Sequence, residues 1–170
     1  MVFVRQITLT DEPFLWHMLG EAAHWRGEPY IVPDLPNFAH LAKYLSGWGR
    51  PGDDGVVAEI NGQPVGAAWY RLFLADDHGY GFINEGIPEL SIGVLPQWRG
   101  KGIGWRLLTA LEEKARDSGY VALSLSVEET NPANRLYTQR GYVQMDKVGG
   151  AWTMLKDLST PESTTQSGFS

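Results

Sequence analysis

The residues best suited to chemistry form a glycine-rich turn directly before an apolar helical pattern. The turn consists of Arg99, Gly100, Lys101, Gly102, Ile103 and Gly104. Such a turn points free backbone N–H groups and the positive end of the helix dipole at the same place, which favours binding of an anion. The absence of Cβ atoms at Gly102 and Gly104 would let the anion approach the backbone. A tight turn without a ligand is the alternative.

The turn does not match the two best-known phosphate-binding patterns. A Walker A loop requires serine or threonine after its lysine, whereas Gly102 follows Lys101. The dinucleotide fingerprint G-x-G-x-x-G fails as well, because Trp105 stands where a motif starting at Gly100 needs its last glycine. An NAD-linked oxidoreductase is therefore disfavoured.

A second motif, NPANRLYTQRGY, occupies residues 131–142. Asn131 followed by Pro132 is typical of a helix start. Together with the glycine turn and the strand-like PELSIGVLP before it, this motif resembles the GNAT superfamily of acyl-CoA-dependent N-acetyltransferases. The close resemblance covers residues 88–142. It implies a mixed α/β fold, with a mostly antiparallel central sheet, splayed strands and flanking helices, and it implies acetyl-CoA as co-substrate.

The resemblance also implies where acetyl-CoA binds. Its pantetheine arm would lie between splayed strands at 90–95 and 121–127, bonding to the backbone near Ile92 and Val94. Its pyrophosphate would lie on the N–H groups of the glycine turn, where Arg99 or Lys101 adds positive charge. Asn131 is a helix cap, a CoA contact or both, because its carboxamide has several donor and acceptor sites.

Acetyl transfer to an amine requires a proton acceptor, a stabilised oxyanion and a proton for the leaving thiolate. Tyr137 matches the family tyrosine that protonates the CoA sulfur, although packing in the core is its alternative role. The Val94 N–H is the oxyanion donor that the resemblance implies. Glu89, on the opposite face of its strand from Leu90, is the first candidate for the base, and Glu85 is the second.

Three further groups are considered for the acceptor side. Glu128 and Glu129 could attract a cationic acceptor, although a solvated rim is the simpler interpretation. Trp69 is expected in the core, since a buried tryptophan removes a large apolar area from water. The segment around Tyr30, with Trp25, is expected to form a substrate lid.

The elements that must position these residues follow from hydrophobic periodicity. Helix 103–118 should bury Leu107, Leu108 and Leu111 on one face, with Glu112 and Glu113 opposite. Asn61-Gly62 predicts a type I′ hairpin turn. Strands are predicted at 2–7, 56–60, 64–74, 89–95, 121–127, 142–148 and 151–155, and the other helices at 13–23, 38–45 and 132–140.

Composition limits the remaining alternatives. A chain of 170 residues, 43% hydrophobic, suits one domain, predicted at 1–158 with a disordered tail at 159–170. Its net charge of -6 disfavours nucleic acid as a partner. It lacks cysteine, and its histidines show no spacing typical of a metal site. Without an apolar leader or a long apolar run, a cytoplasmic protein that does not enter membranes is expected.

The sequence thus predicts an N-acetyltransferase that moves an acetyl group from acetyl-CoA to a small-molecule or protein amine. A non-catalytic acyl-CoA-binding sensor or structural module of the same fold is the alternative. The sequence leaves the oligomeric state open, and a homodimer is a common arrangement in the family that it resembles.

Overall fold

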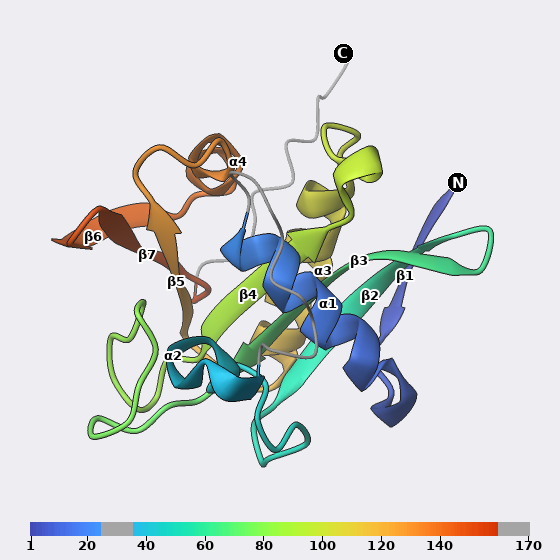
Figure 1. Cartoon of the computed structure of the whole chain (residues 1–170). Coiled ribbons are helices and arrows are strands. Elements are labelled where there is room, and N and C mark those ends of the chain that lie inside the picture. Colours follow the sequence, from blue (N-terminus) through green and yellow to red (C-terminus); the bar gives the residue numbers. More distant parts are fainter. Residues whose placement is uncertain (25–35, 160–170) are drawn as a thin grey trace.

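The computed structural model describes residues 1–24 and 36–159 (Figure 1). In these ranges, seven strands form a sheet in the order β1-β2-β3-β4-β5-β7-β6. The strands are β1 (Val2–Gln6), β2 (Asp54–Ile60), β3 (Gln63–Arg71), β4 (Glu89–Val94), β5 (Ala122–Glu128), β6 (Val143–Val148) and β7 (Ala151–Asp157). The α-helices are α1 (Glu12–Ala23), α2 (Ala39–Ala42), α3 (Ile103–Asp117) and α4 (Ala133–Gln139). The predicted lid residues Trp25 and Tyr30, and the tail from 160, lie outside the described ranges.

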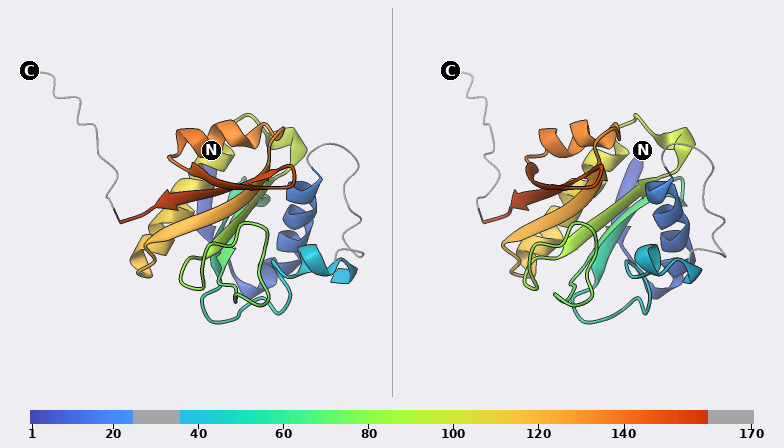
Figure 2. Two further views of the ribbon diagram at one scale, coloured as in Figure 1. Left: turned by 90° about the vertical axis from the view of Figure 1, so that its left-hand side faces the viewer. Right: turned by 60° about the vertical axis from the view of Figure 1, so that its left-hand side comes forward.

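The pair β4–β5 differs from every other strand pair of the sheet. The other described pairs are antiparallel, whereas β4 and β5 are parallel and share a single register pair, Glu89 with Ser124. The Ser124 N–H donates to the Pro88 carbonyl at 3.1 Å. Beyond this point the two strands diverge (Figure 2). The predicted mixed α/β fold, mostly antiparallel with splayed strands, is confirmed.

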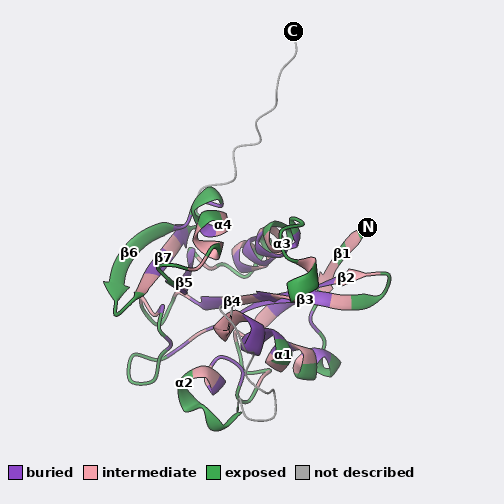
Figure 3. Cartoon of the chain, turned by 45° about the horizontal axis from the view of Figure 1, so that its top comes forward, coloured by how far each residue is buried: buried purple, intermediate pink, exposed green. Residues whose placement is uncertain are grey.

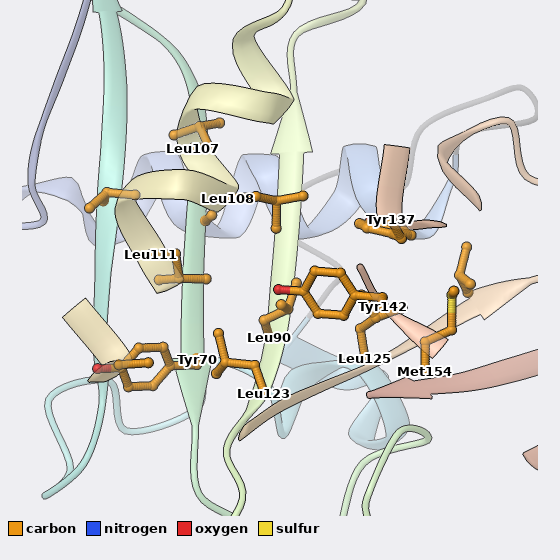
Figure 4. Packing of buried hydrophobic residues seen from close by; sticks show 14 of the residues in the cluster. Tyr70, Leu90, Leu107, Leu108, Leu111, Leu123, Leu125, Tyr137, Tyr142 and Met154 are labelled. Carbon is orange, nitrogen blue, oxygen red and sulfur yellow. The ribbon is translucent and has the colours of Figure 1, made fainter. Parts of the chain in front are cut away.

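Helices cover both faces of the sheet, with α3 and α4 on one face and α1 and α2 on the other (Figure 3). Alternation along β4 and β5 sends Leu90 and Leu125 towards α3, where they join the buried cluster shown in Figure 4. Side chains on the opposite face, such as Trp69 of β3, join a second cluster with α1 and Tyr44. Glu89 faces this second side, because it neighbours Leu90 in a strand.

Gly93 of β4 sets the distance between the sheet and α1. A Cβ built on Gly93 would lie 2.5 Å from the backbone oxygen of Met18. Because real Cβ atoms do not approach an oxygen so closely, only glycine allows α1 to pack here against bare backbone.

The local predictions agree with the structure at one turn and differ at two elements. Asn61 and Gly62 both have positive φ, 52° and 77°, as the predicted type I′ turn requires. Strand β3 ends at Arg71 rather than 74, because Leu74 begins a separate turn by accepting the Asp77 N–H at 3.1 Å. The helix predicted for 38–45 is a single turn, α2, followed by residues whose carbonyls Arg71 binds.

Glu112 was predicted on the exposed face of α3, and this was wrong. Its side chain is completely buried and accepts hydrogen bonds from Arg140, Lys156 and, at 3.1 Å, the Tyr142 hydroxyl. Arg140 also lies over the Trp105 ring, 4.6 Å from its centroid. The carboxylate therefore joins α3 to the end of α4 and to β7 through two cations, which compensates for its desolvation.

Among the helices in the described ranges, none is long and apolar enough to span a membrane.

Replacing Glu112 with alanine should destabilise the protein strongly, because the two buried cations lose the carboxylate that they share. We expect a loss of roughly 3–5 kcal/mol in the free energy of unfolding, measured by urea denaturation. Glu113→Ala, at the exposed neighbouring position, is the matched control and should change stability by less than about 0.5 kcal/mol. Equal effects of the two substitutions would contradict this account of the buried network.

Candidate active site

A cavity of about 830 Å³ lies where β4 and β5 diverge. Residues from both strands line it, together with the glycine turn, the α4 segment, and residues of α1 and α2. The cavity joins most of the residues predicted from the two sequence motifs. The lining includes Glu89, Ile92, Val94, Arg99, Gly100, Gly102, Ile103, Gly104, Asn131 and Tyr137. Lys101 is exposed and Glu85 is exposed, and neither belongs to the lining.

The glycine turn forms one end of the cavity and begins α3. Gly100 and Gly102 have φ of 73° and 80°, in the left-handed region that glycine adopts without strain, and Gly102 is the N-cap of the helix. The first N–H groups of a helix have no acceptor within it, so those that follow Gly102 are available to a ligand at the positive end of α3. Gly104 lies against α4, since a Cβ there would come within 2.9 Å of Leu136 Cδ2.

Arg99 is committed to contacts within the protein. Its backbone N–H donates to the Pro96 carbonyl at 3.3 Å, so this N–H differs from the free donor predicted for the turn. Its guanidinium donates to the Val94 carbonyl at 3.1 Å and to Glu21 of α1 at 3.0 Å. The side chain is nevertheless 40% exposed, and it fixes the turn to both β4 and α1.

The backbone of β4 offers hydrogen-bonding groups to the gap. Leu95 donates its N–H to Val65 of the segment that pairs with β4, and antiparallel hydrogen bonds alternate along a strand. The N–H groups of Ile92 and Val94 therefore point away from β3, towards the side where β5 has separated. A ligand in the gap could replace the missing strand partner.

Glu89 is a buried carboxylate at the closed end of the gap, with 2% of its surface exposed. Its Oε2 accepts a hydrogen bond from the Tyr44 hydroxyl at 2.6 Å. Among the residues that the structure describes, its Oε1 has no hydrogen-bond partner, and neither has the buried Oγ of Ser124. Because these two residues are register partners across the parallel pair, both oxygens lie on the same face and can serve one donor.

Burial shifts the proton affinity of Glu89 into the neutral range. Desolvation raises the pKa of its carboxyl to about 7, and the hydrogen bond from Tyr44 opposes this shift. A carboxyl with this pKa can both take up and release a proton near neutral pH, which is the property that a general base needs.

Tyr137 enters the cavity from α4 and is 7% exposed. Its ring meets that of Tyr142 edge to face, with 6.0 Å between centroids. Burial raises the pKa of its hydroxyl above the ordinary value, so Tyr137 keeps its proton at neutral pH and can donate it. Asn131 caps the segment, because its side-chain oxygen accepts the Ala133 N–H at 2.9 Å.

The structure places only one of the two candidate bases, Glu89, in the cavity lining. Glu85 accepts the Ala75 N–H at 3.0 Å in the loop between β3 and β4, outside the cavity lining.

Of the two residues considered for a cationic acceptor, Glu128 lines the cavity and is exposed, whereas Glu129 pairs with Lys147 at 2.8 Å.

Sequence reasoning missed Tyr44 and Ser124. No motif marks Tyr44, and its contact with Glu89 spans 45 positions in the chain. Ser124 belonged to a predicted strand whose alternation was recognised, and the same alternation could have placed it on the face of Glu89.

In the described ranges, no group of three or more His, Cys, Asp or Glu residues could hold a metal ion.

Residues 15–142 match the model of the acetyltransferase (GNAT) family, and the chain belongs to this family. The chain is 33% identical over 108 residues to the L-amino acid N-acyltransferase MnaT of Escherichia coli K12, a match that covers 61% of this chain and 60% of that protein. The match thus covers less than two thirds of that relative.

Solved structures have the same fold. The ribosomal-protein-alanine N-acetyltransferase of Brucella melitensis, 27% identical, superposes with a TM-score of 0.66 over 91% of this chain and 99% of that one. YncA of Salmonella typhimurium, solved with acetyl-CoA, is 23% identical and has a TM-score of 0.68, covering 95% and 96% of the two chains.

Glu89→Gln should stabilise the protein relative to wild type as pH rises. The pKa of Glu89 rises from an ordinary 4.5 to about 7 on folding, so the unfolded chain releases its proton first and wild-type stability falls between these values. Glutamine does not ionise. We expect the difference in unfolding free energy to grow in favour of the mutant by roughly 2–3 kcal/mol from pH 5 to pH 8.

Urea denaturation of both proteins at several pH values would measure this difference. Glu85→Gln, at the exposed position of the neighbouring loop, is the control and should give no such trend. A constant difference between the Glu89→Gln variant and wild type would show that Glu89 titrates in its ordinary range.

Proposed function

We propose that the protein transfers an acetyl group from acetyl-CoA to a small-molecule or protein amine by direct attack, with Glu89 as general base and Tyr137 as general acid. Membership of the acetyltransferase (GNAT) family supports acyl transfer. The names of the relatives support an amine acceptor, since one acts on L-amino acids and another on a ribosomal-protein alanine. The acetyl-CoA present in the YncA structure supports the co-substrate.

The observation that carries the proposal is the shared cavity of Glu89 and Tyr137. Glu89 comes from the β4 side and Tyr137 from α4, across the gap that the diverging strands leave. The base and the acid thereby come from different elements. Burial brings the pKa of Glu89 close to neutral, and Tyr137 carries a proton at neutral pH. The outward-facing edge of β4, with the Val94 N–H, lines the same cavity.

The residues fit acetyl-CoA by their chemistry. The start of α3 would hold the pyrophosphate through its N–H groups. The free backbone edge near Ile92 would hold the pantetheine amides, as a strand holds its neighbour, and the Val94 N–H would remain for the thioester carbonyl, because Arg99 binds the Val94 carbonyl. The bound thioester supplies an activated carbonyl carbon.

The chain's own groups then account for each proton and bond. Glu89 takes a proton from the ammonium, directly or through water, which exposes the nitrogen lone pair. The N–H of Val94 donates to the carbonyl oxygen as the C–N bond forms and negative charge develops there. Tyr137 gives its proton to the sulfur as the C–S bond breaks and the C=O bond re-forms, and the excess proton of the amide nitrogen leaves to solvent. Glu89 then releases its proton and Tyr137 regains one by exchange with water, so that one proton is released per turnover.

Release of free CoA thiol, followed against polyamines, amino acids, aminoglycosides and peptides, tests the function. We expect turnover with at least one class of amine, and a rise in melting temperature with acetyl-CoA, since a ligand of the folded state stabilises it. Tight acetyl-CoA binding without turnover on a broad panel would instead support the non-catalytic sensor.

Glu89→Gln should abolish most activity near neutral pH, because the amide keeps the size of the side chain and cannot accept the proton. We expect a loss of roughly 10²–10⁴-fold in kcat, with partial recovery at higher pH as free amine becomes available. Wild-type kcat should rise with pH through about 7, as Glu89 ionises. Glu85→Gln is the control and should retain the wild-type pH–rate profile. The reverse pattern would assign the base to Glu85.

Tyr137→Phe should keep acetyl-CoA binding and lose turnover, since it preserves the ring and removes the proton donor. A fall of roughly 10²–10⁴-fold in kcat is expected, with KM for acetyl-CoA little changed. Tyr120→Phe, which removes a tyrosine hydroxyl outside the cavity lining, provides the control. Wild-type turnover by the Tyr137→Phe variant would mean that another donor, such as water, protonates the thiolate.

A further inference from the structure

Tyr44 holds the Glu89 carboxylate by one of its two oxygens. The Tyr44 hydroxyl donates to Glu89 Oε2 at 2.6 Å, and it accepts the backbone N–H of Tyr80 at 2.8 Å. Burial and the neighbouring charge of Glu89 raise the pKa of this tyrosine well above its ordinary value. The hydroxyl therefore stays protonated and acts as the donor to Glu89.

Strand β3 fixes the backbone on which Tyr44 stands. The indole N–H of Trp69 donates to the Tyr44 carbonyl at 3.1 Å. One nitrogen of Arg71 donates to the carbonyls of Lys43 and Ser46, both at 2.8 Å. Because the carbonyls of Lys43 and Ser46 are hydrogen-bonded as well, the backbone from which the Tyr44 side chain extends is held in place.

Arg71 anchors the Tyr44 segment instead of pairing with Glu89, because Asp53 neutralises its charge. Arg71 is the register partner of Glu89 on the neighbouring strand, yet its guanidinium makes a bidentate pair with Asp53 at 2.9 and 2.8 Å. Both side chains of that pair are 1% exposed. The cation that pairs in register with Glu89 is thus committed to Asp53 and to the Tyr44 segment.

The loop between β3 and β4 closes over the pair. A Cβ at Gly79 would lie 2.5 Å from both Glu89 Oε1 and the Tyr44 hydroxyl oxygen. The loop therefore packs on the two oxygens with backbone alone, next to the Tyr80 N–H that Tyr44 accepts. This contact, the hydrogen bond and the anchoring of Tyr44 all restrict the carboxylate to one orientation.

We propose that Tyr44 is a positioning residue for the acetyl transfer, a role that rests on the proposed function of Glu89. Its hydroxyl binds Oε2 and leaves Oε1, which accepts no hydrogen bond from residues 1–24 and 36–159, as the atom that takes the proton. Tyr44 acts through Glu89 and has no bond to make or break itself.

The groups around Glu89 determine how its pKa, and with it the pH profile of activity, would change if the Tyr44 hydroxyl were removed. Burial raises the pKa of Glu89, and the Tyr44 hydrogen bond is the largest effect that lowers it, ahead of the nearby Gly81 N–H and the charges of His78 and Lys43. Of the other charged groups near Glu89, Arg71 is paired with Asp53, Glu21 of α1 with Arg99, and Glu128 is exposed at the far end of β5. Loss of the Tyr44 hydroxyl should consequently raise the pKa of Glu89.

Tyr44→Phe tests the proposal with two readouts that loss of packing alone would not move. In protein labelled with carbon-13 at the glutamate carboxyls, the Glu89 resonance, identified by its loss in Glu89→Gln, should titrate roughly 1–2 pH units higher than in wild type. The rising limb of kcat against pH should move by the same amount, while KM for acetyl-CoA stays unchanged. Tyr120→Phe, in the opposite core cluster, should move neither.

An unchanged titration and an unchanged profile in a folded Tyr44→Phe variant would overturn the proposal. If that variant does not fold, Trp69→Phe, which removes the donor to the Tyr44 carbonyl together with part of a buried ring, should move both readouts in the same direction, and its failure to do so would count equally against the proposal. A wild-type protein that acetylates no amine would overturn the proposed function. The carboxyl titration would then still decide whether Tyr44 controls Glu89.

Discussion

The separation of β4 from β5 is the constraint on which the rest of the structure depends. A parallel pair normally continues its hydrogen bonds along both strands, and here the pairing stops after Glu89 and Ser124. The cost is a length of strand edge without a partner in the middle of a sheet. The cavity and the free N–H groups of β4 both result from this interruption. The same interruption lets β4 and α4 face one cavity from opposite sides of the gap.

The two faces of the sheet solve the problem of buried charge in different ways. On the α3 side, Glu112 is surrounded by two cations and a tyrosine hydroxyl, so every partner of the carboxylate comes from the protein. On the α1 side, Glu89 has one hydroxyl donor, and its other oxygen has no partner in the part of the chain that the structure describes. The first arrangement holds elements together. The second leaves the two protonation states of Glu89 close in free energy, and this is useful only where protons move.

The parts of the site that sequence could predict are those in which backbone conformation dictates residue type. Gly100 and Gly102 need positive φ, and Asn131 caps the helix segment that carries Tyr137, so these motifs are readable from the chain alone. The positions of the strands around them followed from periodicity, and the splaying of two of them followed from the resemblance to known acetyltransferases. The choice between Glu85 and Glu89 did not follow, because burial of Glu89 depends on a loop that folds back over it.

Contacts between distant segments account for what the sequence did not predict. Glu112 lies at the edge of the apolar face of α3, and its cationic partners are 28 and 44 residues further along the chain, so periodicity alone assigned it to solvent. Tyr44 lies in the turn that follows the end of α2. Trp69 and Arg71 of β3 hold this turn by hydrogen bonds to its carbonyls. Neither helix propensity nor a motif contains this information.

The contact of Gly93 with the Met18 carbonyl has a consequence for how relatives of this protein can diverge. Since α1 already lies on bare backbone, the helix can neither sink closer to β4 nor take a larger neighbour at this point. The spacing of strand and helix is thus a fixed dimension of this side of the cavity. Relatives that keep this contact can differ here through the side chains that line the cavity from the loops and helix ends, which in this chain include Tyr80 and His40.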